Sequence, residues 1–309
     1  MLLERIRDFF VHVAWRNVYQ AGDRGDPGWR NAAVTYRNLI VHLDNTAASA
    51  TRLDVAVNLA QRFEARLTGI FAIADGHVQN ASGGKRRGEV LRRAAALTTS
   101  FREQTEAAGV QAEWHMELAT NDARVNQTLV RAVRHFDMAI MGQFAPQSAD
   151  GSIRADLIEQ TVLLSGRPVL IVPYAGSFPH VGRRVIVAWN PNREAVRAVN
   201  DALPLLIDAD RVILVTLDPA AEPRRMVEGP VADMVGHLAA HGIDAGAERL
   251  VYDRGGIDPA DRLLSHIADE AADLLVMGAF SDQKRQIQSS ENLTGHILAH
   301  MTVPVLISH

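Results

Sequence analysis

Short apolar runs alternate with longer amphipathic stretches along most of the chain. In the first half, apolar runs near 38–44, 66–73, 110–117, 137–142 and 168–173 predict buried strands, and stretches with helical spacing near 46–62, 89–108, 122–135 and 154–165 predict helices. Strands and helices that alternate with short connections are typical of a parallel sheet with helices on both faces. The pattern therefore predicts an α/β fold.

The same order of elements returns in the second half of the chain. Strands are expected near 183–189, 211–217, 248–252, 273–278 and 304–308, and helices near 192–206, 227–242, 258–270 and 291–301. Two apolar strands that end in Met-Gly, at Gly142 and Gly278, lie 136 positions apart, and so do Pro168 and Pro304, which open the last strand of each half. This constant offset indicates an internal duplication.

The duplication divides the 309-residue chain into two units of ordinary domain size. Residues 35–174 form the first expected domain and residues 181–309 the second, joined by a linker at 175–180 in a stretch that contains Pro and Gly. Residues 1–34 have no counterpart in the second half, and their apolar stripe predicts an amphipathic helix. We expect this helix to pack on its own domain or on a partner subunit; docking on a membrane surface and an extension without fixed structure are the alternatives.

Composition and charge narrow the range of functions. With a net charge of −4 and a pI near 6.3, the chain has no global attraction for nucleic acids or anionic lipids. It contains no cysteine, which excludes disulfides, thiolate metal sites and a cysteine nucleophile. No apolar run approaches the length of a membrane span, and charged residues near Met1 are not typical of a signal peptide. We therefore expect a cytoplasmic protein without nucleic-acid or membrane partners.

Several landmarks together carry a resemblance to a known family. A strand that ends in Asp44 before a helix, the two Met-Gly strand ends and the closing segments 165–173 and 300–307 resemble the universal stress proteins in their tandem two-domain form. The resemblance covers about 35–309. It implies two Rossmann-like domains of the adenine-nucleotide-hydrolase-like type, each with a five-stranded parallel sheet in the order 3-2-1-4-5. It also implies a ligand crevice at the carboxyl ends of strands 1 and 4, where the strand order reverses.

Members of this family that bind ATP carry a phosphate-binding sequence after the fourth strand: Gly, two residues, Gly, nine residues, and then Gly followed by Ser or Thr. The glycines let the backbone approach the phosphates, and the last pair opens a helix whose free N–H groups hold an anion. The matching positions here are Gly142, Ala145 and Ala155-Asp156 in the first half, and Gly278, Ser281 and Glu291-Asn292 in the second. Asp156 and Glu291 would take up the free N–H groups and repel a triphosphate. We therefore expect no ATP binding.

The candidate ligand-binding residues are Asp44, Gly142, Asn190 and Gly278. Asp44 stands where ATP-binding members use an acidic residue to hold the adenosine part of the nucleotide, and Asn190 is its counterpart in the second half. A helix cap or strand-end carboxylate is an equally weighted role for Asp44. Trp189 is expected in the core, with stacking on a flat ligand as the alternative. A small or nucleoside-like ligand without a triphosphate would fit these residues better than ATP.

Other residue clusters point less clearly to chemistry. Lys85-Arg86-Arg87 follows two glycines without the spacing of a P-loop, which favours a solvated loop and helix face over a phosphate contact. The pairs His237/His241 and His296/His300 have helical spacing, but no glutamate occupies the positions of a zinc-protease motif, so no metal site is expected. No catalytic residues are expected, because linear spacing assembles no Ser-His-Asp set and Gly-x-Ser-x-Gly does not occur.

The resemblance to the tandem universal stress proteins implies a stress-response or signalling module. The alternative is an adenine-nucleotide-binding stress protein with weak ATPase activity in its first domain. In the resembling family the proline-opened last strands lie at sheet edges and pair antiparallel. Strand 169–172 is therefore expected to pair with 305–307, either within one chain or across a homodimer. A protein partner of the N-terminal helix is a further expectation.

Overall fold

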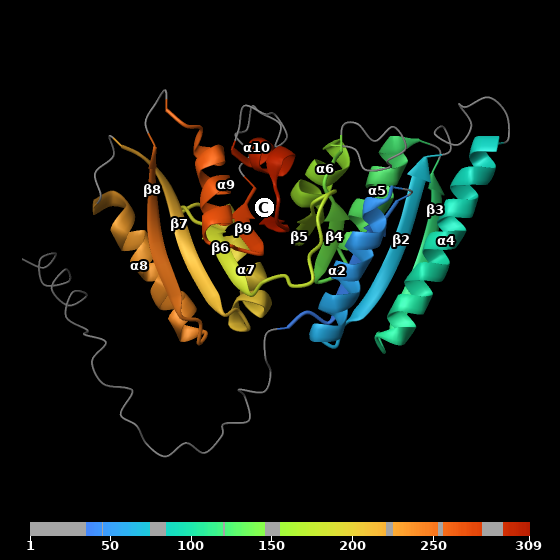
Figure 1. Ribbon diagram of the computed structural model, residues 1–309, viewed down its shortest axis with the longest axis horizontal. Helices are drawn as coiled ribbons and strands as arrows, with labels where there is room; N and C mark the ends of the chain where they lie inside the picture. Colours follow the sequence, from blue (N-terminus) through green and yellow to red (C-terminus); the bar gives the residue numbers. More distant parts are fainter. Residues whose placement is uncertain are drawn as a thin grey trace, which may run out of the picture. The chain divides into compact units, whose positions relative to one another are not determined.

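A sheet of ten strands forms the centre of the described structure (Figure 1). The computed structural model describes residues 35–44, 46–74, 85–119, 121–145, 155–220, 225–252, 256–279 and 293–309. The helix predicted within residues 1–34 lies outside these ranges. None of the helices inside them is long and apolar enough to cross a membrane.

The first repeat alternates strand and helix, as the sequence predicts. Its strands are β1 (Asn38–Leu43), β2 (Arg66–Ala74), β3 (Ala112–Ala119), β4 (Met138–Gly142) and β5 (Val169–Val172). Its helices are α2 (Ala48–Arg62), α4 (Lys85–Ala107), α5 (Asp122–Val133) and α6 (Ala155–Ser165). Helix α4 begins at Lys85 and not near 89, so the segment Lys85-Arg86-Arg87 belongs to the helix and not to a preceding loop.

The second repeat follows the same order. Its strands are β6 (Arg184–Ala188), β7 (Arg211–Pro219), β8 (Ala245–Tyr252), β9 (Leu274–Gly278) and β10 (Val305–Ser308). Its helices are α7 (Arg193–Ile207), α8 (Arg225–Ala240), α9 (Pro259–Asp269) and α10 (Leu293–His300). Strand β8 starts before the expected 248, because as an edge strand it has exposed and half-buried positions that weaken its apolar pattern.

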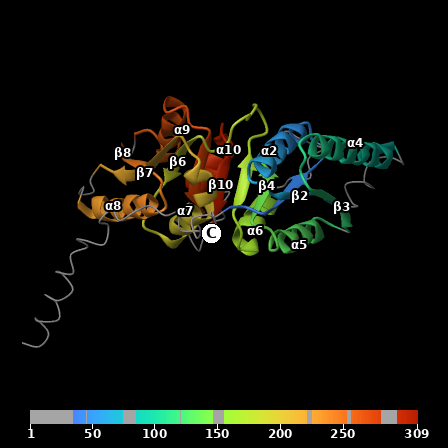
Figure 2. The same cartoon turned by 90° about the horizontal axis from the view of Figure 1, so that it is seen from below.

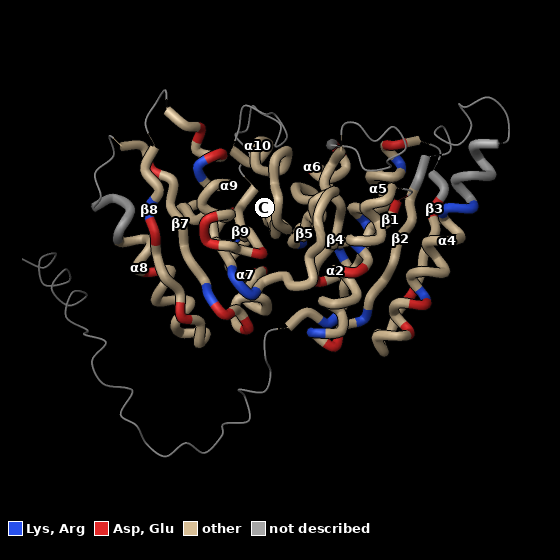
Figure 3. The backbone as a smooth tube through the Cα atoms, viewed as in Figure 1, with Lys and Arg blue, Asp and Glu red and all other residues tan. Residues whose placement is uncertain are grey.

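Each repeat contributes five parallel strands in the order expected. The first half of the sheet is β3-β2-β1-β4-β5, and the second half is β8-β7-β6-β9-β10, which is the order 3-2-1-4-5 in both. Strands β1, β4, β5, β9 and β10 contain no Asp, Glu, Lys or Arg, and Figure 3 shows this uncharged centre. Such strands suit a parallel sheet that is covered on both faces.

The two halves join through their last strands. Strand β10 pairs antiparallel with β5 in the same chain, with Leu306 opposite Leu170 and Val305 opposite Ile171. This is the pairing expected for 169–172 and 305–307, in its intramolecular form. The two five-stranded sheets thereby become one, and neither last strand is left as an open edge. Residues Thr35–His309 form a single unit, while the homodimer stays a prediction.

The apolar core covers both faces of this sheet and continues from one repeat into the other. Neighbouring residues of a strand point to opposite faces. Leu170 and Leu306 therefore lie on the face covered by α2, α4, α7 and α8. Ile171 and Ile307 lie on the face covered by α5, α6, α9 and α10. Figure 2 shows the helices of each repeat on the two sides of its strands.

Candidate functional site

The sheet brings the four candidate residues together in two pairs. Asp44 follows β1 and Gly142 ends β4, and these two strands are neighbours. Asn190 follows β6 and Gly278 ends β9, which are also neighbours. In both pairs the carboxyl ends meet where the strand order reverses, the usual position of a ligand crevice in such sheets. Strands β5 and β10 separate one pair from the other in the sheet.

Asp44 is buried and uses one carboxylate oxygen for several contacts. Its Oδ1 accepts hydrogen bonds from Thr46 N at 3.1 Å and from Thr46 Oγ1 at 2.6 Å. The Ser49 hydroxyl lies 2.7 Å from the same oxygen and accepts a hydrogen bond from Asp44 N at 2.9 Å. The N-cap residue of α2, Ala47, has no side-chain cap bond. Asp44 thus acts as a strand-end carboxylate that organises the turn into α2.

Arg52 of α2 adds a buried positive charge to this carboxylate. Both side chains are only 1% exposed, and Arg52 Nη2 lies 3.5 Å from Asp44 Oδ1. Arg52 Nη1 donates a hydrogen bond to the backbone oxygen of His42 at 2.6 Å. Burial lowers the pKa of Arg52, and the charge of Asp44 acts against this. Inside a protein such a pair is stable only when both partners are present.

The same environment shifts the pKa values of Asp44 and His42. Burial alone would raise the pKa of Asp44, but the Arg52 charge, together with His42 and the bonds from Thr46 and Ser49, lowers it to about 2. Burial, and next the Arg52 charge, lowers the pKa of His42 to about 4 against the opposing effects of Asp44 and the Ala72 backbone. At neutral pH Asp44 and Arg52 are therefore charged and His42 is neutral.

The second carboxylate oxygen of Asp44 differs from the first in having no partner among the residues that the structure describes. Asp44 Oδ2 is buried and has no hydrogen-bond partner within the described residues. A carboxylate oxygen is an acceptor for a hydroxyl or amino group. Sequence reasoning missed Arg52 as the partner of Asp44, because arginine on an amphipathic helix usually faces solvent. Its place among buried neighbours of α2 is the one available signal.

A glycine is needed at position 278 because this position packs closely against α7, a helix of the same repeat. A Cβ atom built on Gly278 would lie 2.6 Å from the backbone nitrogen of Ala195 and 2.6 Å from the carbonyl carbon of Glu194, both in the first turn of α7. No side chain fits there without moving the backbone. The space that the glycine leaves open is therefore filled by α7. In the first repeat, Gly142 is buried and pairs with Val172 of β5.

The second crevice has a neutral residue where the first has Asp44. Asn190 is half-buried, and its Oδ1 accepts a hydrogen bond from Asn192 N at 3.2 Å in the turn before α7. The preceding Trp189 is only 6% exposed and belongs to the apolar core, the role we expected for it. Its Nε1 is buried without a hydrogen-bond partner among the described residues. The residue that follows β6, the first strand of this repeat, therefore contributes no side-chain charge.

In the first repeat, the structure describes the helix start that would hold phosphates. Asp156 lies in the first turn of α6, so its carboxylate charge is at this helix start, as predicted. Its Oδ2 accepts a hydrogen bond from Asn126 Nδ2 at 3.0 Å, which bridges α5 and α6. The corresponding residues of the second repeat, Ser281 and Glu291-Asn292, lie outside the described residues. A carboxylate at this place disfavours a second negative group.

The histidine pairs differ in their surroundings. The rings of His237 and His241 lie 4.8 Å apart. Those of His296 and His300 lie 4.4 Å apart, and His296 Nε2 is also 2.7 Å from Asp261 Oδ1 of α9. Asp258 lies beside this contact, an association across two helices that linear spacing did not indicate. The side chains of Lys85, Arg86 and Arg87 lie outside what the structure describes.

Comparisons with known proteins place the fold. No protein-family model and no curated protein matches the sequence. The structure is similar to the crystal structure of a universal stress protein from Archaeoglobus fulgidus DSM 4304, with 15% identity, a TM-score of 0.67, and coverage of 88% of this chain and 97% of that one. It is also similar to a functionally unknown protein from Pseudomonas aeruginosa PAO1, with 15% identity, a TM-score of 0.60, and coverage of 90% and 94%.

Proposed function

We propose that this chain, whose fold is that of the universal stress proteins in tandem form, is a stress-response or signalling module that does not retain ATP. The observation that carries the proposal is that other residues of the protein already bind the Asp44 carboxylate. Its Oδ1 is occupied by Thr46, Ser49 and Arg52, all from the same repeat. A carboxylate committed to a buried cation is a poor candidate for holding a nucleotide.

The positions that would bind phosphate in each repeat support the same proposal. In the first repeat, Asp156 places a negative charge in the turn of α6 that would face a triphosphate. In the second repeat, the backbone of α7 fills the space beside Gly278 that a glycine could otherwise leave to a ligand. The module would then act through its surfaces, and we place it in the cytoplasm.

Binding of an adenine nucleotide by the first repeat, with weak hydrolysis, is the alternative. One observation favours it: Asp44 Oδ2 is buried and has no partner in the part of the chain that the structure describes. A ribose hydroxyl could donate a hydrogen bond to this oxygen. The same chemistry would suit adenosine, which lacks the phosphates that Asp156 repels.

The test is to denature the purified full-length protein and measure adenine nucleotide in the supernatant by chromatography. Thermal unfolding with ATP and magnesium, and separately with adenosine, completes it. A ligand at about 100 times its Kd adds about 2.7 kcal/mol to the free energy of unfolding, which is easily measured. We expect no released nucleotide and no shift with ATP.

Two variants decide between the proposals. Asp44→Asn removes the charge of the candidate residue, and Asp54→Asn changes an exposed aspartate of the helix α2 that follows it, as a control. About one nucleotide per chain, or an ATP-induced shift that Asp44→Asn abolishes and Asp54→Asn preserves, would overturn the proposal. A shift with adenosine alone, lost in Asp44→Asn, would identify a ligand without phosphates.

A further inference from the structure

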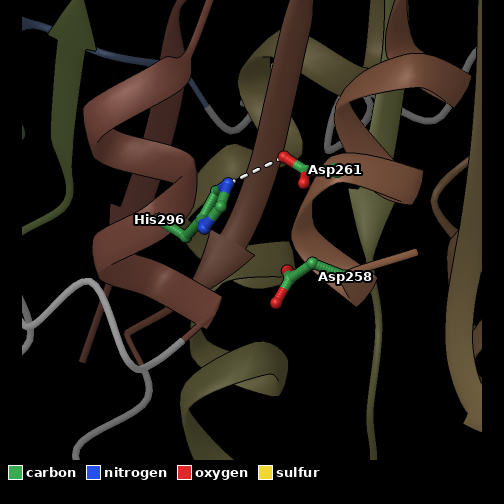
Figure 4. Close-up of side chains that lie close together, drawn as sticks. All are labelled: Asp258, Asp261 and His296. Atoms are coloured by element: carbon green, nitrogen blue, oxygen red, sulfur yellow. Dashed lines mark hydrogen bonds and ion pairs between the residues drawn. The ribbon is translucent and has the colours of Figure 1, made fainter. Parts of the chain in front are cut away.

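Two helices of the second repeat bring three metal-ligating side chains to one place. Asp258 precedes α9, Asp261 lies in its first turn, and His296 lies in α10. One ligand atom from each of these side chains lies within 4.8 Å of the other two. Figure 4 shows the three side chains in the space between the two helices, with the imidazole of His296 directed at Asp261. Both aspartates are exposed and the histidine is half-buried, so an ion could enter from solvent.

The packing of α9 against α10 holds this arrangement. Leu263 and Ile267 of α9 and Ile297 of α10 are fully buried in the same apolar cluster. Asp261 and His296 therefore stand on regular helices whose opposite faces are anchored in the core, which is the condition for a precise site. Asp258 is the N-cap residue of α9, which ties its position to the same helix.

The first repeat indicates which part of the cluster the fold itself requires. There a hydrogen bond from Asn126 to Asp156 bridges the helices α5 and α6. In the second repeat the bond between His296 and Asp261 bridges α9 and α10, from different positions of the two helices. A side-chain link between these two helices is thus present in both repeats. Asp258 caps α9 as the neutral Asn121 caps α5, so its charge is an addition that the cap does not need.

The charges of the cluster are also not balanced by cations. Across the described ranges, no Lys or Arg makes an ion pair with either aspartate, and the contact from His296 is an ion pair only when the imidazole is protonated. Asp258 Oδ1 accepts a hydrogen bond from Ala260 N at 2.7 Å, which caps α9 and leaves its other oxygen for a ligand. With a neutral imidazole, the cluster carries two negative charges and offers one nitrogen and two oxygen donors.

We propose that Asp258, Asp261 and His296 form a binding site for one divalent transition-metal ion, with zinc as the best match. Imidazole and carboxylate together suit zinc, whereas magnesium and calcium prefer oxygen alone. A tetrahedral zinc ion with bonds of about 2.0–2.2 Å places two donors about 3.3–3.6 Å apart. The ligand atoms of the cluster lie within 4.8 Å of one another and 2.7 Å apart in the pair of His296 and Asp261, which is close to this spacing. Three protein ligands leave one position for water or a further ligand.

Calorimetric titration of the full-length chain with zinc chloride near neutral pH tests the proposal. We expect one ion per chain. Asp258→Asn keeps the helix cap, because asparagine is an equally good N-cap residue, but it removes the charge. His296→Gln keeps a hydrogen-bond donor to Asp261 but removes the imidazole. Each variant should bind zinc at least about tenfold more weakly, since even the loss of an outer contact at a metal site costs about 10–100-fold.

The control variant is His241→Gln, which disrupts the other helical histidine pair and should leave zinc binding unchanged. Cobalt(II) provides a second readout, since its visible absorption in the wild-type protein should disappear in His296→Gln. Unchanged zinc affinity in Asp258→Asn and His296→Gln would overturn the proposal. Loss of binding in His241→Gln would overturn it as well, because the ion would then belong to that pair.

Discussion

The side chain of Gln143 in the first repeat donates a hydrogen bond to the backbone oxygen of Leu298 in the second, over 2.9 Å. The same Nε2 lies 3.1 Å from the oxygen of Ala299, and Gln143 Oε1 accepts a hydrogen bond from Tyr174 N at 3.2 Å. The counterpart of Gln143 in the second repeat is Ala279, which has no polar side-chain atom. The residue after the Met-Gly landmark therefore ties the first repeat to the end of α10 in an asymmetric way.

Gln143→Leu should lower the free energy of unfolding by about 1–3 kcal/mol. Leucine has a similar volume but leaves the buried carbonyl group of Leu298 without this donor, and an unsatisfied buried polar group costs this much. Urea unfolding measures the effect. Gln61→Leu, at an exposed position of α2, is the matched control and should change stability by less than about 0.5 kcal/mol. Equal losses in the two variants would contradict the role of Gln143.

Asp44→Asn should cost about 3–5 kcal/mol, because it leaves the buried Arg52 charge without its partner. The double variant Asp44→Asn/Arg52→Met removes both charges and should lose clearly less than the sum of the two single variants. A double-mutant cycle by urea unfolding gives this difference. Additive losses would mean that the two side chains do not interact.

Stability should fall as the pH is lowered from 6.5 toward 4, because of His42. Burial lowers the pKa of His42 from 6.5 to about 4, so in this window the unfolded chain binds a proton that the folded chain does not. The free energy of unfolding then decreases by up to about 3 kcal/mol. Asp44, with a pKa lowered from 3.8 to about 2, adds a separate loss below this window.

Urea unfolding near pH 7 and near pH 5 measures the effect of His42. His42→Leu should show a much smaller loss between the two conditions than the wild-type protein. His115→Gln, at an exposed position of β3, should retain the wild-type loss. If the His42 variant kept the full wild-type pH dependence, the loss of stability could not be assigned to His42.

Gly278→Ala should destabilise the protein by about 1–3 kcal/mol, the usual cost of overpacking a core. The added Cβ would lie 2.6 Å from the backbone of Ala195, so either β9 or the start of α7 must move. Gly236→Ala is the control within α8, because a Cβ there meets nothing within 4 Å. Alanine in an open helical position should raise stability by about 0.5–1 kcal/mol. Thermal unfolding that ranks the two variants in the opposite order would exclude the packing role of Gly278.

Much of the fold could be predicted, because the signals that define it are local. Uncharged runs such as 138–142 and 169–172 have the composition of strands buried on both faces, and the helices between them have apolar stripes. Weaker signals gave less accurate boundaries. The edge strand β8 is half-exposed and begins before its apolar run, and α4 extends back through the basic residues Lys85-Arg86-Arg87.

The candidate site was predictable in position but not in its contacts. Asp44 and Asn190 stand at the expected strand ends, because parallel strands of known order place their carboxyl ends together. Arg52 was not anticipated as a partner, since burial of an arginine depends on what the rest of the fold packs around it. The association of His296 with Asp261 was missed for the same reason: the two residues are distant in sequence and meet through helix packing.

The sequence by itself determined the duplication, the alternation of strands and helices, and the residues available at each strand end, because periodicity and spacing are properties of the chain. Tertiary structure alone decided how those residues are used. It joined the two sheets through β5 and β10, filled the space beside Gly278 with the backbone of α7, and placed the Arg52 charge against Asp44. The physical reason is that burial and close contact depend on segments that no local pattern relates to each other. These contacts decide whether a strand-end carboxylate faces a ligand or the protein itself.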